Sequence, residues 1–157
     1  MANKIIILST FWYANKMIEN QSFLMPKDDG LCQIDLSDNK YCVYSIALTH
    51  PSVEKQIAFI GSNIREANCL KPTYKLLMDY KKDKDWEKYK IDYVKLMKER
   101  KQSIYDFISS MEDDMVYFLC CWENTIRGAN CHRKIIYDIC TSSTKMKEMA
   151  IWRYVDE

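Results

Sequence analysis

The sequence is poor in features that mark several classes of protein. Its 157 residues hold only 3 glycines and 3 prolines, which excludes collagen-like and linker-rich chains. The apolar run near the N-terminus, Ile5 to Leu8, is shorter than the roughly 7–15 residues of a signal-peptide core. No run approaches the ~18 apolar residues of a membrane span. With 23 Lys and Arg against 22 Asp and Glu, no net field draws the protein to a membrane or to nucleic acid.

Cysteine is plentiful, but its pattern is not that of a secreted protein. The chain has 7 cysteines, an odd number at irregular spacing, whereas a disulfide framework usually has an even number. We therefore expect a cytoplasmic protein with mostly free thiols. Nothing in the sequence calls for a cofactor.

The content that is present indicates an ordinary globular fold. Hydrophobic residues make up 48% and charged residues 29% of the chain. A typical domain has about 150 residues, so residues 1–157 should form a single domain. This size is sufficient for a hydrophobic core without disulfide or zinc support.

Hydrophobic patterning predicts an α/β fold with a largely parallel sheet flanked by helices. Continuous apolar runs are typical of strands buried on both faces. Strands are predicted at 4–8, 31–36, 41–48, 57–60, 116–121 and, from its alternation, 149–155. Ser9 and Thr10 should begin the first loop. Helical spacing starts at Pro72 and continues through Trp86–Met97 and Ile104–Met111, and Asn130 should cap a further helix.

The segment 71–101 is locally basic, with a net charge of about +5 by count of its charged side chains. One interpretation is a solvated helical face with ion pairs between neighbouring turns. The other is a surface that faces phosphate groups. The sequence leaves both open.

Chemically capable side chains gather around the strand at 116–121 and the helix that follows it. In parallel sheets ligands bind beyond the carboxyl ends of strands, and a helix N-terminus attracts anions. Cys131 should lie in the first turn, where a thiol pKa is usually lowered, and we expect it to be the most reactive thiol. His132 can exchange a proton near neutral pH, Arg133 can hold a phosphate or carboxylate, and Glu123 can act as a general base. Cys121 and Arg127 complete the candidate ligand-binding group.

These residues carry a family resemblance. Cys121-Trp122-Glu123 followed by Cys131-His132-Arg133 resembles the signature of the domain of unknown function 488 family, in which a strand ends in Cys-x-Glu and Cys-His-Arg opens a helix. The segment Leu70-Lys71-Pro72-Thr73 and the later Trp86, Tyr89 and Tyr93 resemble that family's second block. The two blocks cover roughly residues 70–140. The resemblance implies an α/β single domain and supplies no reaction.

The N-terminal half departs from the family pattern. The family has a Gly-x-Ser loop after its first strand, where this chain has Ser9-Thr10-Phe11-Trp12. It has an Asp-x-Arg motif after the second strand, where this chain has Asp35 without the arginine.

Structural roles stand beside the chemical ones. Cys121 and Cys131 can be core residues, since free cysteine is among the most buried types, and Arg133 can pair with Glu123 as a brace. A zinc site is disfavoured because Cys121, Cys131 and His132 lack the spacing of structural zinc ligands, so we predict no metal. The spacing from Cys121 to Arg127 is that of cysteine phosphatases, but the loop between them has no glycine and contains a carboxylate.

Two functions remain open. In the first, the 116–133 strand, loop and helix form a catalytic or ligand-binding site for a nucleotide, a nucleic acid or another phosphate-bearing molecule. In the second, the protein is an interaction or regulatory module that binds a protein partner, and the Cys-His-Arg motif only braces the loop.

Overall fold

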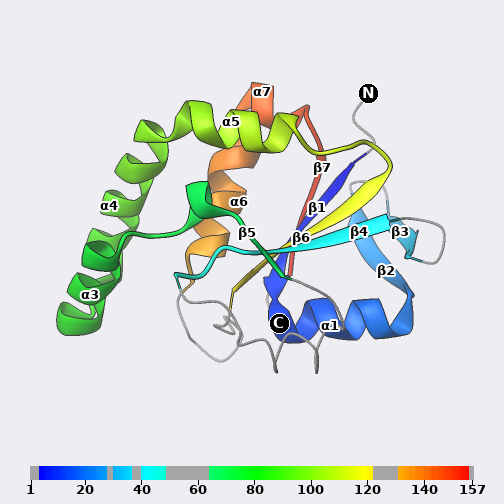
Figure 1. Cartoon of the computed structure of the whole chain (residues 1–157), viewed down its shortest axis with the longest axis horizontal. Coiled ribbons are helices and arrows are strands. Elements are labelled where there is room, and N and C mark those ends of the chain that lie inside the picture. Colours follow the sequence, from blue (N-terminus) through cyan, green and yellow to red (C-terminus); the bar gives the residue numbers. More distant parts are fainter. Residues whose placement is uncertain (1–3, 28–29, 37–39, 49–63, 122–130, 156–157) are drawn as a thin grey trace.

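A computed structural model describes residues 4–27, 30–36, 40–48, 64–121 and 131–155 (Figure 1). Seven strands and seven helices fall within these ranges. The strands are β1 (Ile5–Thr10), β2 (Ser22–Lys27), β3 (Gly30–Asp35), β4 (Lys40–Ser45), β5 (Arg65–Glu66), β6 (Met115–Cys121) and β7 (Ile151–Tyr154). The helices are α1 (Phe11–Asn20), the 3-10 turn η1 (Asn68–Leu70), α3 (Tyr74–Asp83), α4 (Trp86–Glu99), α5 (Lys101–Ser109), α6 (His132–Ser142) and α7 (Thr144–Lys147).

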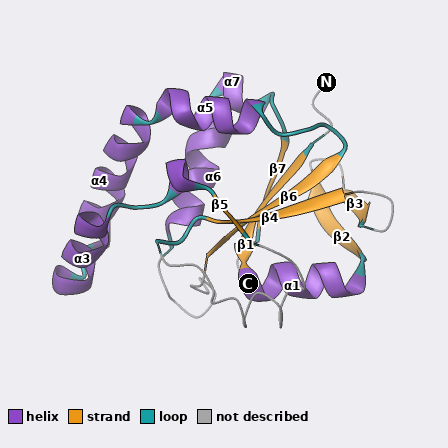
Figure 2. Cartoon of the chain, in the orientation of Figure 1, coloured by secondary structure: helices purple, strands orange, loops and turns teal. Residues whose placement is uncertain are grey.

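Five strands form a parallel sheet in the order β5-β4-β6-β1-β7 (Figure 2). The predicted strand at 116–121 is β6, which lies in the middle of the sheet with all but its first residue buried. Strands buried on both faces need continuous apolar runs, and β1 and β6 have them. The α/β prediction with a largely parallel sheet is confirmed.

The segment 31–36 is a strand, but it lies outside the parallel sheet. It forms β3, which pairs antiparallel with β2 as a separate two-stranded sheet. Strand β2 was not predicted from the sequence, because Pro26 interrupts its apolar run and proline argues against a central strand. The strand predicted at 57–60 lies outside the described residues.

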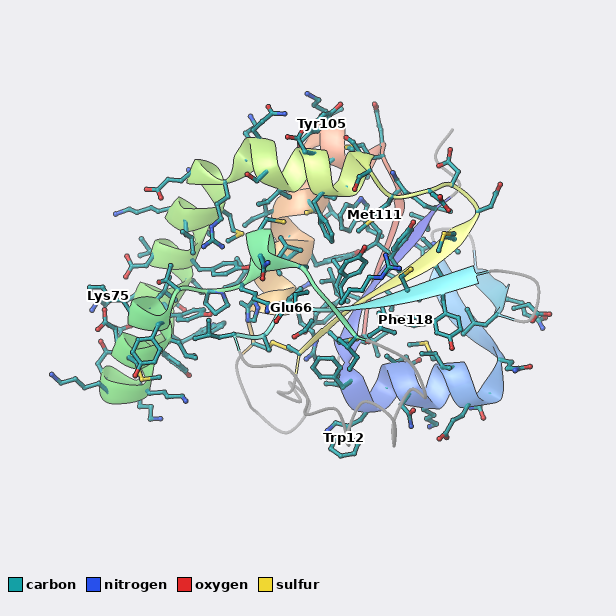
Figure 3. The ribbon with its side chains drawn as sticks, viewed as in Figure 1. Trp12, Glu66, Lys75, Tyr105, Met111 and Phe118 are labelled. Atoms are coloured by element: carbon teal, nitrogen blue, oxygen red, sulfur yellow. A yellow bond between two sulfur atoms is a disulfide. The ribbon has the colours of Figure 1, made fainter. Side chains whose placement is uncertain are left out.

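The alternation of side chains along the strands builds two cores. Ile7 and Phe118 face α1, as Figure 3 shows for Phe118, whereas Leu8 and Leu119 face the layer of α4, α5, α6 and α7. The sheet is therefore covered by one helix on one face and by several on the other (Figure 1). Cys121 belongs to the core on the side of α4, α5, α6 and α7.

Local signals set the helix boundaries. Ser9 and Thr10 do not begin a loop as predicted; they complete β1, and the Thr10 hydroxyl accepts a hydrogen bond from Tyr13 N at 3.1 Å and so caps α1. The helix predicted from Pro72 begins two residues later, at Tyr74, because the Thr73 hydroxyl accepts a hydrogen bond from Leu76 N and caps α3. The apolar stripe from Trp86 lies in α4. Within the described ranges, no helix has the length and apolar content to cross a membrane.

Candidate functional site

The candidate site lies at the ends of β1 and β6, two neighbouring strands whose connections lead to opposite edges of the sheet. After β1 the chain continues through α1 and returns to the sheet as β4, on the far side of β6. After β6 it continues through α6 and returns as β7, on the far side of β1. The two strands end side by side, since Thr10 pairs with Cys121. Ligands of parallel α/β sheets bind at such a switch point, outside the carboxyl ends of the strands.

Cys121 and Cys131 meet at this point. Cys121 ends β6, and Cys131 is the residue before α6, with extended backbone angles (φ −141°, ψ 140°). Their sulfur atoms form a disulfide. The expected position of Cys131 is corrected: Cys131, rather than Asn130, occupies the cap position and lies just outside the first turn. Cys121 and Cys131 are bonded to each other and so are not free thiols. Among the other described cysteines, Cys42, Cys69, Cys120 and Cys140 are free.

Arg133 joins the disulfide to the helix. Its side chain is fully buried, and Nη1 donates a hydrogen bond to Cys121 Sγ at 3.1 Å. The guanidinium also lies over the ring of Tyr154, 5.5 Å from its centre.

The geometry distinguishes Cys121 from its neighbour Cys120. Cys120 points to the α1 side of the sheet and lies 3.8 Å from Ser9 Oγ. Burial raises the pKa of the Cys120 thiol to about 12, although Ser9 and Arg133 act in the opposite direction. Cys120 is therefore a protonated core residue.

His132 is held as a neutral imidazole. Its Nε2 donates to the carbonyl of Ile46 at 2.8 Å, so Nδ1 is the unprotonated nitrogen, 4.0 Å from Cys131 Sγ. Burial, with a smaller effect of Arg133, lowers the pKa of His132 to about 4. The expectation that His132 exchanges a proton near neutral pH is wrong for this arrangement, because the ring is only 6% exposed.

Tyr93 positions His132, a role that the sequence analysis did not assign. The ring of Tyr93 lies 5.3 Å from that of His132, and its hydroxyl donates to the carbonyl of Leu70 at 2.7 Å. Tyr93 in turn stacks on Tyr89, and Tyr89 on Trp86. The spacing of this aromatic block was visible in the sequence, but its contact with the Cys-His-Arg motif depends on how α4 packs against α6.

The remaining predicted site residues, Glu123 and Arg127, lie outside the described residues. The structure therefore brings together four of the six: Cys121, Cys131, His132 and Arg133. In the described part of the chain, no group of three or more His, Cys, Asp or Glu side chains is arranged to hold a metal ion.

Comparison with known families agrees with the motifs. Residues 64–144 match the family described as the active DUF488-N3 subclade. The chain belongs to the domain of unknown function 488 family. The matched segment includes both the Cys-His-Arg motif and the aromatic block that supports it. No curated protein and no solved structure matches the chain.

Proposed function

We propose that the cluster at the ends of β1 and β6 is a thiol-based site that acts on or binds a phosphate-bearing molecule, with nucleotides and nucleic acids as the ligand class. The contact that carries this proposal is the hydrogen bond from buried Arg133 to Cys121 Sγ, at the switch point of the sheet. A guanidinium is a preferred partner of phosphate, and it also activates a thiol.

Each described residue has a part in this proposal. Reduced Cys121 supplies the nucleophilic thiolate, and Arg133 holds the negative charge beside it. Neutral His132 orients the start of α6 through its bond to Ile46. The N-terminus of α6 also carries a partial positive charge, which favours an anion. Glu123 and Arg127 keep the roles that the sequence suggested, as base and as a second ligand contact.

The oxidation state matters to this function. In the disulfide, neither Cys121 nor Cys131 can act as a thiolate. Reduction to two thiols is therefore the condition under which the site should bind and react. Cys131 then stands 4.0 Å from Nδ1 of neutral His132, which can accept a hydrogen bond from its thiol.

Burial favours a second candidate function. Cys121, Cys131, His132 and Arg133 are all buried, with none more than 6% exposed. Each contacts another member of the cluster or the backbone. A cluster used only to brace the loop would have this property. The protein would then be an interaction or regulatory module that binds a protein partner.

Substitution of Arg133 by lysine distinguishes the ligand-binding thiol site from a purely structural cluster. The assay is a melting curve of the reduced protein with and without a panel of nucleotides and short oligonucleotides. We expect at least one of them to raise the melting midpoint of the wild type. Arg133→Lys retains the charge but loses the planar fork, so the ligand-induced shift should disappear.

Arg100→Lys is the matched control. Arg100 also bonds protein acceptors, the carbonyls of Cys69 and Lys71, but it lies between α4 and α5 rather than at the Cys121–Cys131 pair. This variant should lose some stability and keep the ligand-induced shift. If no nucleotide or oligonucleotide moves the wild-type midpoint, and Arg133→Lys loses only stability, the structural role is correct and the proposed site is not.

A further inference from the structure

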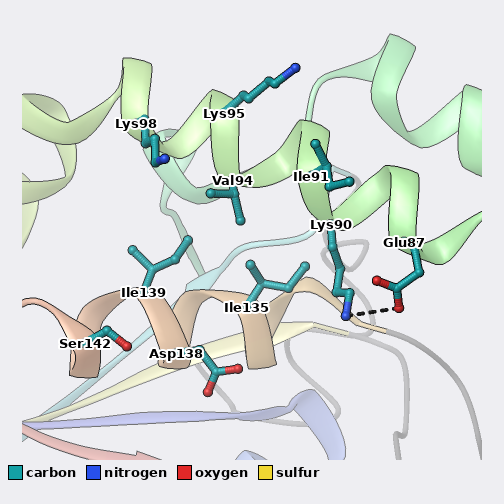
Figure 4. Close-up of a pocket in the computed structure, with 10 residues that line it drawn as sticks. All are labelled: Glu87, Lys90, Ile91, Val94, Lys95, Lys98, Ile135, Asp138, Ile139 and Ser142. Atoms are coloured by element: carbon teal, nitrogen blue, oxygen red, sulfur yellow. Dashed lines mark ion pairs between the residues drawn. The ribbon is translucent and has the colours of Figure 1, made fainter.

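An open apolar groove runs between α4 and α6, away from the thiol site. It has a volume of about 610 Å³. Figure 4 shows Val94 of α4 pointing toward Ile135 and Ile139 of α6 across it. Ile91, at its edge, is 57% exposed. An isoleucine of this exposure beside other aliphatic side chains marks a surface suited to a partner.

A deeper cavity continues the groove toward α5 and α7. It has a volume of about 230 Å³ and shares Val94, Lys98 and Ile139 with the groove. Its walls include the buried side chains of Met97 and Ile136. Apolar cavities of about 150 Å³ already accept a benzene ring, so this one can take a bulky apolar side chain.

Charge around the groove is unbalanced. Glu87 is paired with Lys90 at 3.2 Å, and Asp138 with Lys134 at 3.3 Å. Lys95 and Lys98 line the groove, and Lys98 and Lys101 line the deeper cavity. None of these three lysines forms an ion pair within the described part of the chain. Three lysines that form no ion pair within the described residues therefore line the groove and the deeper cavity.

We infer that the groove receives an amphipathic helix of a partner protein, with an apolar stripe flanked by acidic residues and one bulky apolar side chain in the deeper cavity. The α4 positions that line the groove follow the helical repeat, namely 87, 90, 91, 94, 95 and 98. They span about three turns, or about 17 Å, which sets the length of the partner helix. A third helix packed on two others buries such a stripe, and acidic flanks meet the lysines.

The test uses a fluorescein-labelled helical peptide of about 14 residues. It carries apolar residues at i, i+3, i+4 and i+7, one of them phenylalanine, with glutamates on both flanks. Fluorescence anisotropy should detect binding that weakens as salt is added. Lys98→Glu combined with Lys101→Glu should weaken binding about tenfold. Ile91→Ser removes an exposed apolar contact and should weaken it without loss of fold, which circular dichroism checks.

Matched controls make the result specific. Lys16→Glu combined with Lys81→Glu makes the same change of net charge at exposed positions outside the groove, and binding should change less than about twofold. A peptide with the same apolar stripe and lysine flanks should bind much more weakly. Absence of binding by the glutamate-flanked peptide, equal binding of the lysine-flanked peptide, or equal effects of the two double variants would each overturn the inference.

Discussion

Acidification should destabilise this protein through the imidazole of His132. Burial lowers the pKa of His132 to about 4 in the folded state, from an ordinary value of 6.5. As the pH falls, the unfolded chain therefore takes up the proton first. The stability that comes from a neutral buried imidazole is complete above about pH 6.5 and is lost as the pH falls toward 4.

The size of the effect follows from the two pKa values. The free energy of unfolding should be about 2 kcal/mol lower at pH 5 than at pH 8, and about 3 kcal/mol lower near pH 4. A typical folded protein has a stability of only about 5–15 kcal/mol, so the loss should be easily measured. Protonation of exposed carboxylates affects stability at lower pH. The hydrogen bond from Lys75, for example, lowers the pKa of Asp79.

The assay is urea unfolding of the wild type and of His132→Gln at pH 8, 6 and 5. Glutamine can still donate to the carbonyl of Ile46, but it does not titrate. The wild type should lose about 2 kcal/mol more than the variant between pH 8 and pH 5. His50 is present in both proteins, so its contribution cancels when the pH dependence of the two proteins is compared. The same pH dependence in both would refute the assignment of this effect to His132.

The thiols and the aromatic stack give further expectations. Without reductant, Cys121 and Cys131 should resist iodoacetamide because their sulfur atoms are bonded to each other. After reduction, both thiols should react before Cys120, whose pKa is raised by burial. Timed alkylation with mass spectrometry checks this order, and equally fast labelling of Cys120 would contradict it. Tyr93→Phe removes the donor to the carbonyl of Leu70 and should cost about 1–2 kcal/mol in urea unfolding. A variant as stable as the wild type would mean that this hydrogen bond contributes nothing.

Local sequence determined most of the elements. The continuous apolar runs of β1 and β6 and the helical stripe of α4 are properties of neighbouring residues, so their periodicity predicts them. The Cys-His-Arg motif also indicated where a site would lie, because a helix that follows a parallel strand brings its N-terminus to the strand's carboxyl end. The hairpin of β2 and β3 was not predicted, since its pairing depends on partners rather than on its own pattern.

Tertiary structure decided the chemistry of the site. Strand order placed β6 beside β1, and the alternation along β6 sent Cys121 toward Arg133 and Cys120 away from it. The spacing of the motif could not reveal that His132 is buried against Tyr93, which removes its proton exchange near neutral pH. Burial and electrostatic contact depend on which distant segments pack together, and those long-range contacts are set by the whole fold rather than by any one segment.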